Sequence, residues 1–144
     1  MFAKASDFTG GAFFKPADHM NDLALLIEPK RIEKGVPNTY QGQTRIRDEV
    51  YADIAVFATS ESLDKGEPTE TLKNAKVVHG MLTSTLEQAM GQAMVSIVRK
   101  IPTKGGSGYV FRDTDASTEA KVADYYTKRE AAIGEAMESV PDFD

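Results

Sequence analysis

The side chains best suited to binding chemistry in this sequence are cations and aromatic rings that fall in two stretches of the chain. Positions 30–47 hold five basic side chains and one acid, and positions 99–112 hold four basic side chains and no acid. Such clusters are typical of surfaces that bind polyanions. The basic residues are Lys30, Arg31, Lys34, Arg45, Arg47, Arg99, Lys100, Lys104 and Arg112, and the rings that could stack on flat ligands are Tyr40, Tyr51, Tyr109 and Phe111.

Residues for catalysis or metal binding are few. The chain contains no Cys, which excludes thiol nucleophiles, thiolate zinc sites and disulfides. Its two histidines, His19 and His79, have no partner at metal-ligand spacing. The glycine-rich segment 105–108 follows a lysine, but a phosphate-binding loop needs a helix after it, and the pattern predicts a strand there. We therefore expect no enzymatic activity and no metal or cofactor.

Length and charge favour one acidic-tailed domain. The chain has 144 residues, with 17 Lys and Arg against 22 Asp and Glu, which gives a net charge of −5. All five charged residues from position 130 onward are acidic, so the rest of the chain is neutral overall. No apolar run has the length of a membrane span or a signal peptide, and we expect a cytoplasmic protein.

Hydrophobic periodicity predicts five strands, at 23–28, 45–58, 75–82, 93–101 and 108–112, and two helices, at 83–91 and 118–132. The loops are expected at 30–43, 60–71 and 102–107, where Gly and Pro interrupt the pattern. Residues 45–58 alternate most clearly, with even positions that are apolar apart from Asp48 and with Arg45, Arg47 and Tyr51 in a row on the other face. Phe111 is expected in the core, and Tyr109, which shares its face, either packs there or stacks on a ligand.

This order of elements predicts a mainly β fold, the five-stranded OB-fold barrel with a helix between its third and fourth strands. We expect an N-terminal arm (1–22), the OB-fold domain with its C-terminal helix (23–132) and a flexible acidic tail (133–144). OB-folds bind ligands on strands 2 and 3 and on the loops between strands 1–2 and 4–5. Both basic clusters fall on those loops, so we expect them to meet along one groove.

The tail has a binding pattern of its own. An acidic segment of this kind cannot bury enough apolar surface to fold alone. Its last residues, Asp142, Phe143 and Asp144, could place a ring in an apolar pocket of a partner protein while the carboxylates meet a basic rim. An end that only improves solubility is the alternative.

The segments 53–57, 94–100 and 108–115, taken with the strand order and the tail, resemble single-stranded DNA-binding proteins of bacteriophages that infect actinobacteria. The resemblance implies a protein that coats single-stranded DNA with little sequence preference during phage DNA replication, recombination or repair, in the host cytoplasm, with a tail that recruits partner proteins. Unlike bacterial relatives, the chain lacks Trp, which leaves electrostatics a larger share of binding. The alternative is a structural or adaptor OB-barrel that binds proteins. A homodimer could form through a barrel strand or the last helix, and the sequence leaves this open.

Overall fold

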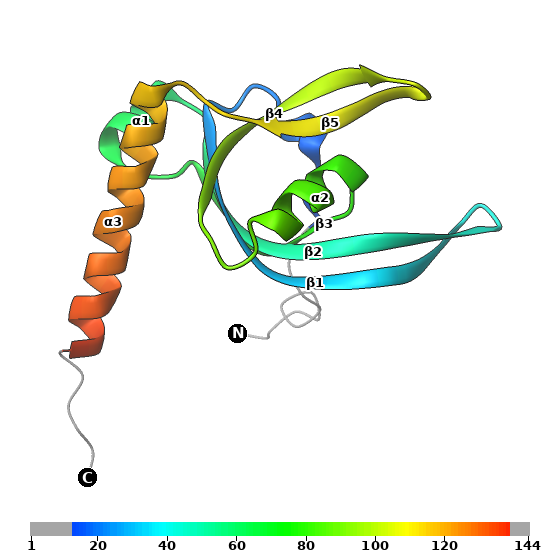
Figure 1. Cartoon of the computed structure of the whole chain (residues 1–144). Coiled ribbons are helices and arrows are strands. Elements are labelled where there is room, and N and C mark those ends of the chain that lie inside the picture. The colour runs from blue at the N-terminus through cyan, green and yellow to red at the C-terminus, as the bar shows by residue number, and fades with distance from the viewer. Residues whose placement is uncertain (1–12, 139–144) are drawn as a thin grey trace, which may run out of the picture.

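Five antiparallel strands frame the molecule in the computed structural model, which describes residues 13–138 (Figure 1). The strands are β1 (Ala24–Tyr40), β2 (Gln43–Phe57), β3 (Glu70–Val77), β4 (Met94–Thr103) and β5 (Gly106–Arg112), and the helices are α1 (Ser60–Lys65), α2 (Gly80–Gln88) and α3 (Ala116–Glu138). The strand order is β3-β2-β1-β4-β5, and the sheet curls into a half-barrel with β3 and β5 at its edges. The predicted mainly β fold with five strands and a C-terminal helix is confirmed.

The core fills the inside of the half-barrel. The alternation in β2 is confirmed from Val50 to Val56, whose even positions are buried. Leu82 and Leu86, one turn apart on α2, are fully buried against this face, and Phe111 of β5 joins them. Figure 1 shows α2 lying between the β1–β2 and β4–β5 hairpins. The helix therefore fills the space that the open half-barrel leaves between its two arms.

A second core lies on the outside of the sheet, beneath α3. Ala55 and Phe57, at odd positions of β2, are buried there with Leu63 of α1 and Val122 of α3. The ring of Phe57 meets Tyr125 edge to face, with centroids 5.2 Å apart. The outer face of β2 therefore has two parts, one covered by α3 and one, toward the hairpin tip, that α3 leaves open (Figure 1).

The predicted loop at 30–43 is wrong, because β1 continues through it. The Pro29 carbonyl accepts a hydrogen bond from the Gly91 N–H (3.4 Å), on the side of β1 away from β2. Because the nitrogen and the carbonyl of one strand residue point to the same side, the N–H that proline lacks would not have bonded to β2. Gly35, with φ of +64°, forms a bulge, and its N–H donates to Asp48 (3.1 Å). Only Gln41 and Gly42, both at positive φ, form the turn. The first basic cluster therefore lies mainly on a strand.

The segments between β2 and β4 also differ from the prediction. The expected loop at 60–71 contains α1, whose cap Thr59 exchanges side-chain hydrogen bonds with Ser62, and the first residues of β3. The expected strand 75–82 ends at Val77, and the helix predicted from residue 83 begins at Gly80. The apolar residues around position 80 are compatible with a strand or with a helix. The helix forms here because it buries Leu82 against the core.

The C-terminal helix is longer than predicted. Asp115 caps it by accepting a hydrogen bond from the Thr118 N–H (2.8 Å). The helix then continues to Glu138, past the predicted end at residue 132. The start of the predicted tail is therefore helical, and Asp142, Phe143 and Asp144 lie outside the described residues. Over the described part of the chain, no helix is both long enough and apolar enough to cross a membrane.

Candidate nucleic-acid interface

The open part of the outer face carries a row of side chains in register across three strands. Tyr51 of β2 lies opposite Arg31 of β1 on one side and Lys76 of β3 on the other. The guanidinium carbon of Arg31 is 4.1 Å from the centre of the Tyr51 ring, and the Lys76 Nζ is 5.6 Å from it. Cross-strand neighbours project from the same face of a sheet, so the register itself places one aromatic ring between two cations.

Phe13 extends this row beyond the edge strand. It forms a parallel bridge with Lys76, and the next residue, Phe14, donates its N–H to the Lys76 carbonyl (2.9 Å). Phe14 is buried and stacks on His19, with centroids 5.0 Å apart. Phe13 is 51% exposed, with the Lys76 Nζ 5.2 Å from its ring. Burial of one phenylalanine thus holds the other on the surface.

A buried carboxylate organises the row. Glu49, only 4% exposed, accepts hydrogen bonds from Nη2 (2.9 Å) and Nε (3.1 Å) of Arg47 and lies 3.6 Å from the Lys76 Nζ. Arg47 binds Oε2 of this carboxylate, and the Tyr51 hydroxyl is 3.5 Å from Oε1. One anion thereby restrains two cations and a ring, which lowers the entropy that these side chains lose on binding a ligand. We call Phe13, Arg31, Arg47, Glu49, Tyr51 and Lys76 the platform.

The β4–β5 hairpin supplies a second group at the end of β3. Lys100 and Tyr109 lie opposite each other, with the Lys100 Nζ 5.8 Å from the ring centre. The Tyr109 ring meets His79 edge to face at 5.4 Å. Burial lowers the pKa of His79, and the positive charge of Arg47 lowers it further. His79 and Tyr109 line one pocket with Phe13, so the two groups adjoin each other.

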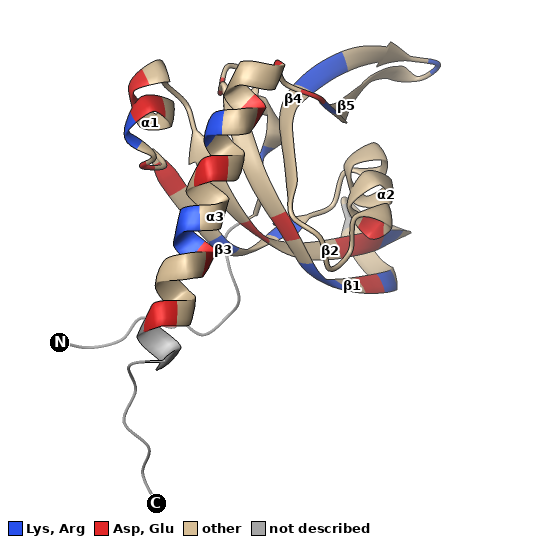
Figure 2. Cartoon of the chain, turned by 60° about the vertical axis from the view of Figure 1, so that its left-hand side comes forward, with Lys and Arg blue, Asp and Glu red and all other residues tan. Residues whose placement is uncertain are grey.

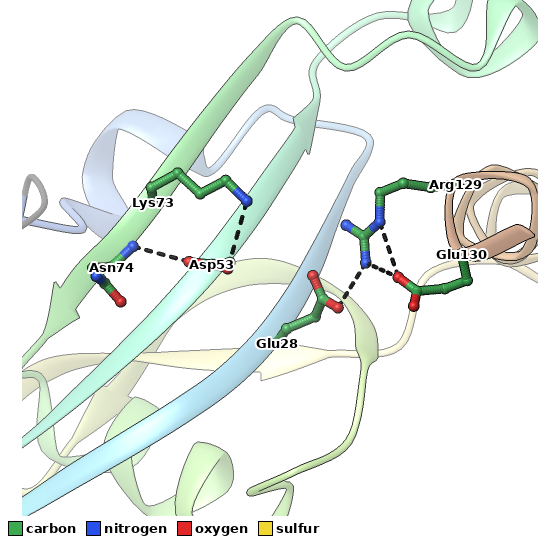
Figure 3. A network of polar contacts seen from close by, with 6 residues as sticks. All are labelled: Glu28, Asp53, Lys73, Asn74, Arg129 and Glu130. Atoms are coloured by element: carbon green, nitrogen blue, oxygen red, sulfur yellow. Dashed lines mark hydrogen bonds and ion pairs between the residues drawn. The ribbon is translucent and has the colours of Figure 1, made fainter. Parts of the chain in front are cut away.

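Polar contacts mark the border between the platform and α3 (Figure 3). Glu28 and Asp53 lie opposite each other on β1 and β2, next to the platform on the same outer face. Arg129 of α3 donates to Glu28 (Nη2–Oε1 2.7 Å), while Asp53 pairs with Lys73 (3.6 Å). The acids at this border are thus balanced by cations outside the platform, and Arg129 fixes α3 at the edge of the open surface.

Five of the predicted residues belong to these two groups. Arg31, Arg47 and Tyr51 lie on the platform, and Lys100 and Tyr109 lie beside His79. Both hairpins extend to the same side of the molecule, away from α3 (Figure 1), and basic segments mark the β4–β5 hairpin up to its tip, whereas α3 carries both signs (Figure 2). Tyr109 is half-buried, which is intermediate between the two expectations, and Phe111 is in the core as predicted.

The remaining cations are spread over other surfaces. Lys34 is bound to Glu87 of α2 (Nζ–Oε1 2.5 Å), and this contact raises the pKa of Lys34. Arg99 and Arg112 lie on the face of the β4–β5 hairpin opposite to Lys100, because strand neighbours alternate. The second basic cluster is therefore divided between two faces.

The other predicted residues lie at the ends of the hairpins or beside α3. Arg45 is exposed near the tip of the β1–β2 hairpin, and Tyr40 is the last residue of β1, opposite Gln43. Lys104 is exposed in the turn between β4 and β5, and Lys30 lines a groove beside Arg129.

Sequence reasoning missed four residues of these two groups: Phe13, Glu49, Lys76 and His79. Phe13 lies in an arm without clear periodicity, although two adjacent phenylalanines in an extended segment must point to opposite sides. Lys76 stands between the buried Ala75 and Val77, and this alternation was the available signal for an outward cation. No local pattern in the sequence brings His79 near Phe13.

Within residues 13–138 no group of three or more His, Asp or Glu side chains is arranged to hold a metal ion. Comparison with protein-family models, with curated proteins and with solved structures finds no match to this chain.

Proposed function

We propose that this chain is a non-catalytic OB-fold protein that binds single-stranded DNA with little sequence preference and coats it during replication, recombination or repair of phage DNA. Two features support the OB-fold. The strand order β3-β2-β1-β4-β5 is that of an OB barrel opened between its third and fifth strands, and α2 occupies the position between the third and fourth strands. The platform lies on the first three strands, which include the strands that OB-folds use for binding.

The observation that carries the proposal is the row Arg31–Tyr51–Lys76, continued by Phe13. Binding of single strands needs cations that follow the phosphates and rings on which bases stack, and each stacked base contributes about 1–3 kcal/mol. The row alternates these two kinds of side chain at the spacing of neighbouring strands. Bases inside a duplex already stack on each other, so the rings favour single strands. Aromatic rings and cations make few hydrogen bonds to the edges of the bases, where sequences differ, and this accounts for the weak sequence preference.

The tail has a separate part in the proposal. Asp142, Phe143 and Asp144 recruit replication or recombination proteins, because a ring flanked by carboxylates suits an apolar pocket with a basic rim. This part rests on the sequence, since these residues lie outside the described part of the chain.

Fluorescence-anisotropy titration of the full chain with a single-stranded oligonucleotide and with its duplex, from about 50 to about 300 mM salt, tests the proposal. Single strands should bind more tightly, and the logarithm of affinity should fall with the logarithm of salt concentration by about 0.7 per phosphate contact. Lys76→Ala should reduce this slope, and Lys128→Ala, which removes one exposed cation from α3, should not. Binding that favours the duplex or ignores salt would refute the proposal and favour an adaptor barrel.

A further inference from the structure

A shallow apolar pocket lies beside the platform, between the N-terminal segment, the end of β3 and β5. Phe13, Pro16 and Ala17 form one side, and Val78, His79 and Tyr109 form the other. Almost all of its wall is apolar, and its volume is about 310 Å³. Ligand pockets commonly span about 300–1,000 Å³, so this one suits a single planar ring system rather than a large ligand.

The walls of the pocket are held in place by the fold. Phe14, 2% exposed, stacks on His19 at 5.0 Å and packs near Phe111, which anchors the segment from Phe13 to Ala17 against the core. On the other side, the rings of His79 and Tyr109 pack edge to face, so each restrains the other. The pocket is therefore formed before any ligand arrives, which keeps the entropic cost of binding low.

The rim of the pocket is basic. Lys15 lies on it, Lys76 lies 5.2 Å from the Phe13 ring, and Lys100 lies 5.8 Å from the Tyr109 ring. Within residues 13–138, neither Lys15 nor Lys100 has an ion-pair partner. An apolar floor with cations around it matches a flat aromatic group whose attached chain carries negative charge on both sides. A nucleotide within a strand has that chemistry.

We infer that this pocket binds one unstacked nucleobase of the DNA single strand that lies on the platform. The inference rests on the proposed function, because the platform must first hold the strand. Phe13 belongs to both surfaces, so a strand that passes over it can place one base on the platform side of the ring and the next in the pocket. The pocket then contributes affinity that depends on the base, in addition to the contacts of the phosphates.

Two variants isolate the pocket in the full chain. Ala17→Phe fills it without removing a charge, and His79→Ala removes one wall without removing a side-chain cap from α2. Ala131→Phe, the same change on an exposed position of α3, is the matched control. The probes are an oligothymidine of about 20 nucleotides and an abasic strand of the same length, which has the same phosphates and no bases.

Both pocket variants should weaken oligothymidine binding by about fivefold or more, the lower bound for one stacked base, and leave the abasic strand unaffected. Photo-crosslinking with 5-iododeoxyuridine should label Tyr109 or His79 in the unmodified chain, and Ala17→Phe should abolish that adduct while an adduct at Tyr51 or Phe13 remains. Unchanged oligothymidine affinity in both pocket variants, or adducts on the platform alone, would overturn the inference and leave the proposed function standing. If Ala17→Phe does not fold, His79→Ala decides between these outcomes. Failure of the unmodified chain to bind either strand would refute the proposed function itself.

Discussion

Arg31 covers the ring of Tyr51, with its guanidinium carbon 4.1 Å from the ring centre across the β1–β2 pair. Arg31 also forms an ion pair with Glu33. A strand bound on the platform would exchange Glu33 for a phosphate and would place a base on the tyrosine or on the guanidinium plane. The two side chains therefore contribute by different physics, charge in one case and stacking in the other.

This difference predicts two separate signatures. Tyr51→Ala should lower the affinity for oligothymidine by about 1–3 kcal/mol without changing its salt dependence, because it removes a stacking face and no charge. Arg31→Ala should lower the salt slope by about 0.7, because it removes one phosphate contact. Anisotropy titrations at several salt concentrations measure both quantities. Tyr51→Phe is the control and should bind as the unmodified chain does; unchanged affinity in Tyr51→Ala would mean that bases stack elsewhere.

Glu49 and Glu33 lie opposite each other on β2 and β1, yet they should differ in their effect on stability. Glu49 is buried and holds Arg47 and Lys76, whereas the Glu33 side chain is 42% exposed. Glu49→Gln should lower the free energy of unfolding by about 1.5–3 kcal/mol, the usual contribution of hydrogen bonds to a charged group. Glu33→Gln should change it by less than about 1 kcal/mol, as for an exposed ion pair. Urea denaturation of both variants measures the difference, and equal losses would contradict the organising role of Glu49.

The sequence predicts this fold well where one physical signal dominates. Val50 to Val56 alternate because one face is buried, and Asp115 caps α3 because an aspartate before a helix can accept its free N–H groups. The sequence misleads where the same residue types are compatible with two local structures. Pro29 and Gly35 are typical of loops, but a bulged strand with a free edge accommodates both, and only the long pairing with β2 selects the strand.

The candidate site could be predicted only within single strands. Period two places Arg47 and Tyr51 on one face from the sequence alone, and the structure agrees. The pairing of Tyr51 with Lys76 depends on the register between β2 and β3, which includes a bulge near Asn74, a non-glycine residue at positive φ. The position of Phe13 depends on burial of Phe14, a tertiary contact that no local pattern encodes.

His79 should make the stability of the protein depend on pH. Its pKa is lowered from 6.5 in the folded state, first by burial and then by Arg47, so the unfolded chain binds a proton more readily. The stability from His79 is therefore complete above about pH 6.5 and is lost as the pH falls from there to the lowered pKa. Urea midpoints at about pH 7.5 and about pH 5.5 should show a smaller decrease in His79→Gln than in the unmodified chain. Identical pH dependence in the two proteins would refute this assignment.

Arg129 should determine how firmly α3 is held. Its guanidinium bonds Glu28 and lies 5.2 Å from the Tyr126 ring, and its side chain is only 25% exposed. Arg129→Ala leaves Glu28 without this partner and should cost about 1–3 kcal/mol of unfolding free energy, with faster hydrogen exchange in α3. Lys65→Ala, which removes an exposed ion pair with Glu61, should cost less than about 1 kcal/mol. Unchanged exchange in α3 would show that Val122 and the tyrosines suffice to hold the helix.

The acidic end of the chain should oppose DNA binding. A chain that ends at Glu138 keeps the whole described fold and loses two carboxylates, Asp142 and Asp144, that repel phosphates. Its affinity for single strands should therefore be equal to or higher than that of the full chain, with the larger gain at low salt, where charges are least screened. The full chain with Asp142→Asn and Asp144→Asn should behave in the same way, whereas Phe143→Ala should not change DNA affinity. A large loss of affinity on truncation would assign the tail to the DNA-binding surface and contradict its proposed role as a site for partner proteins.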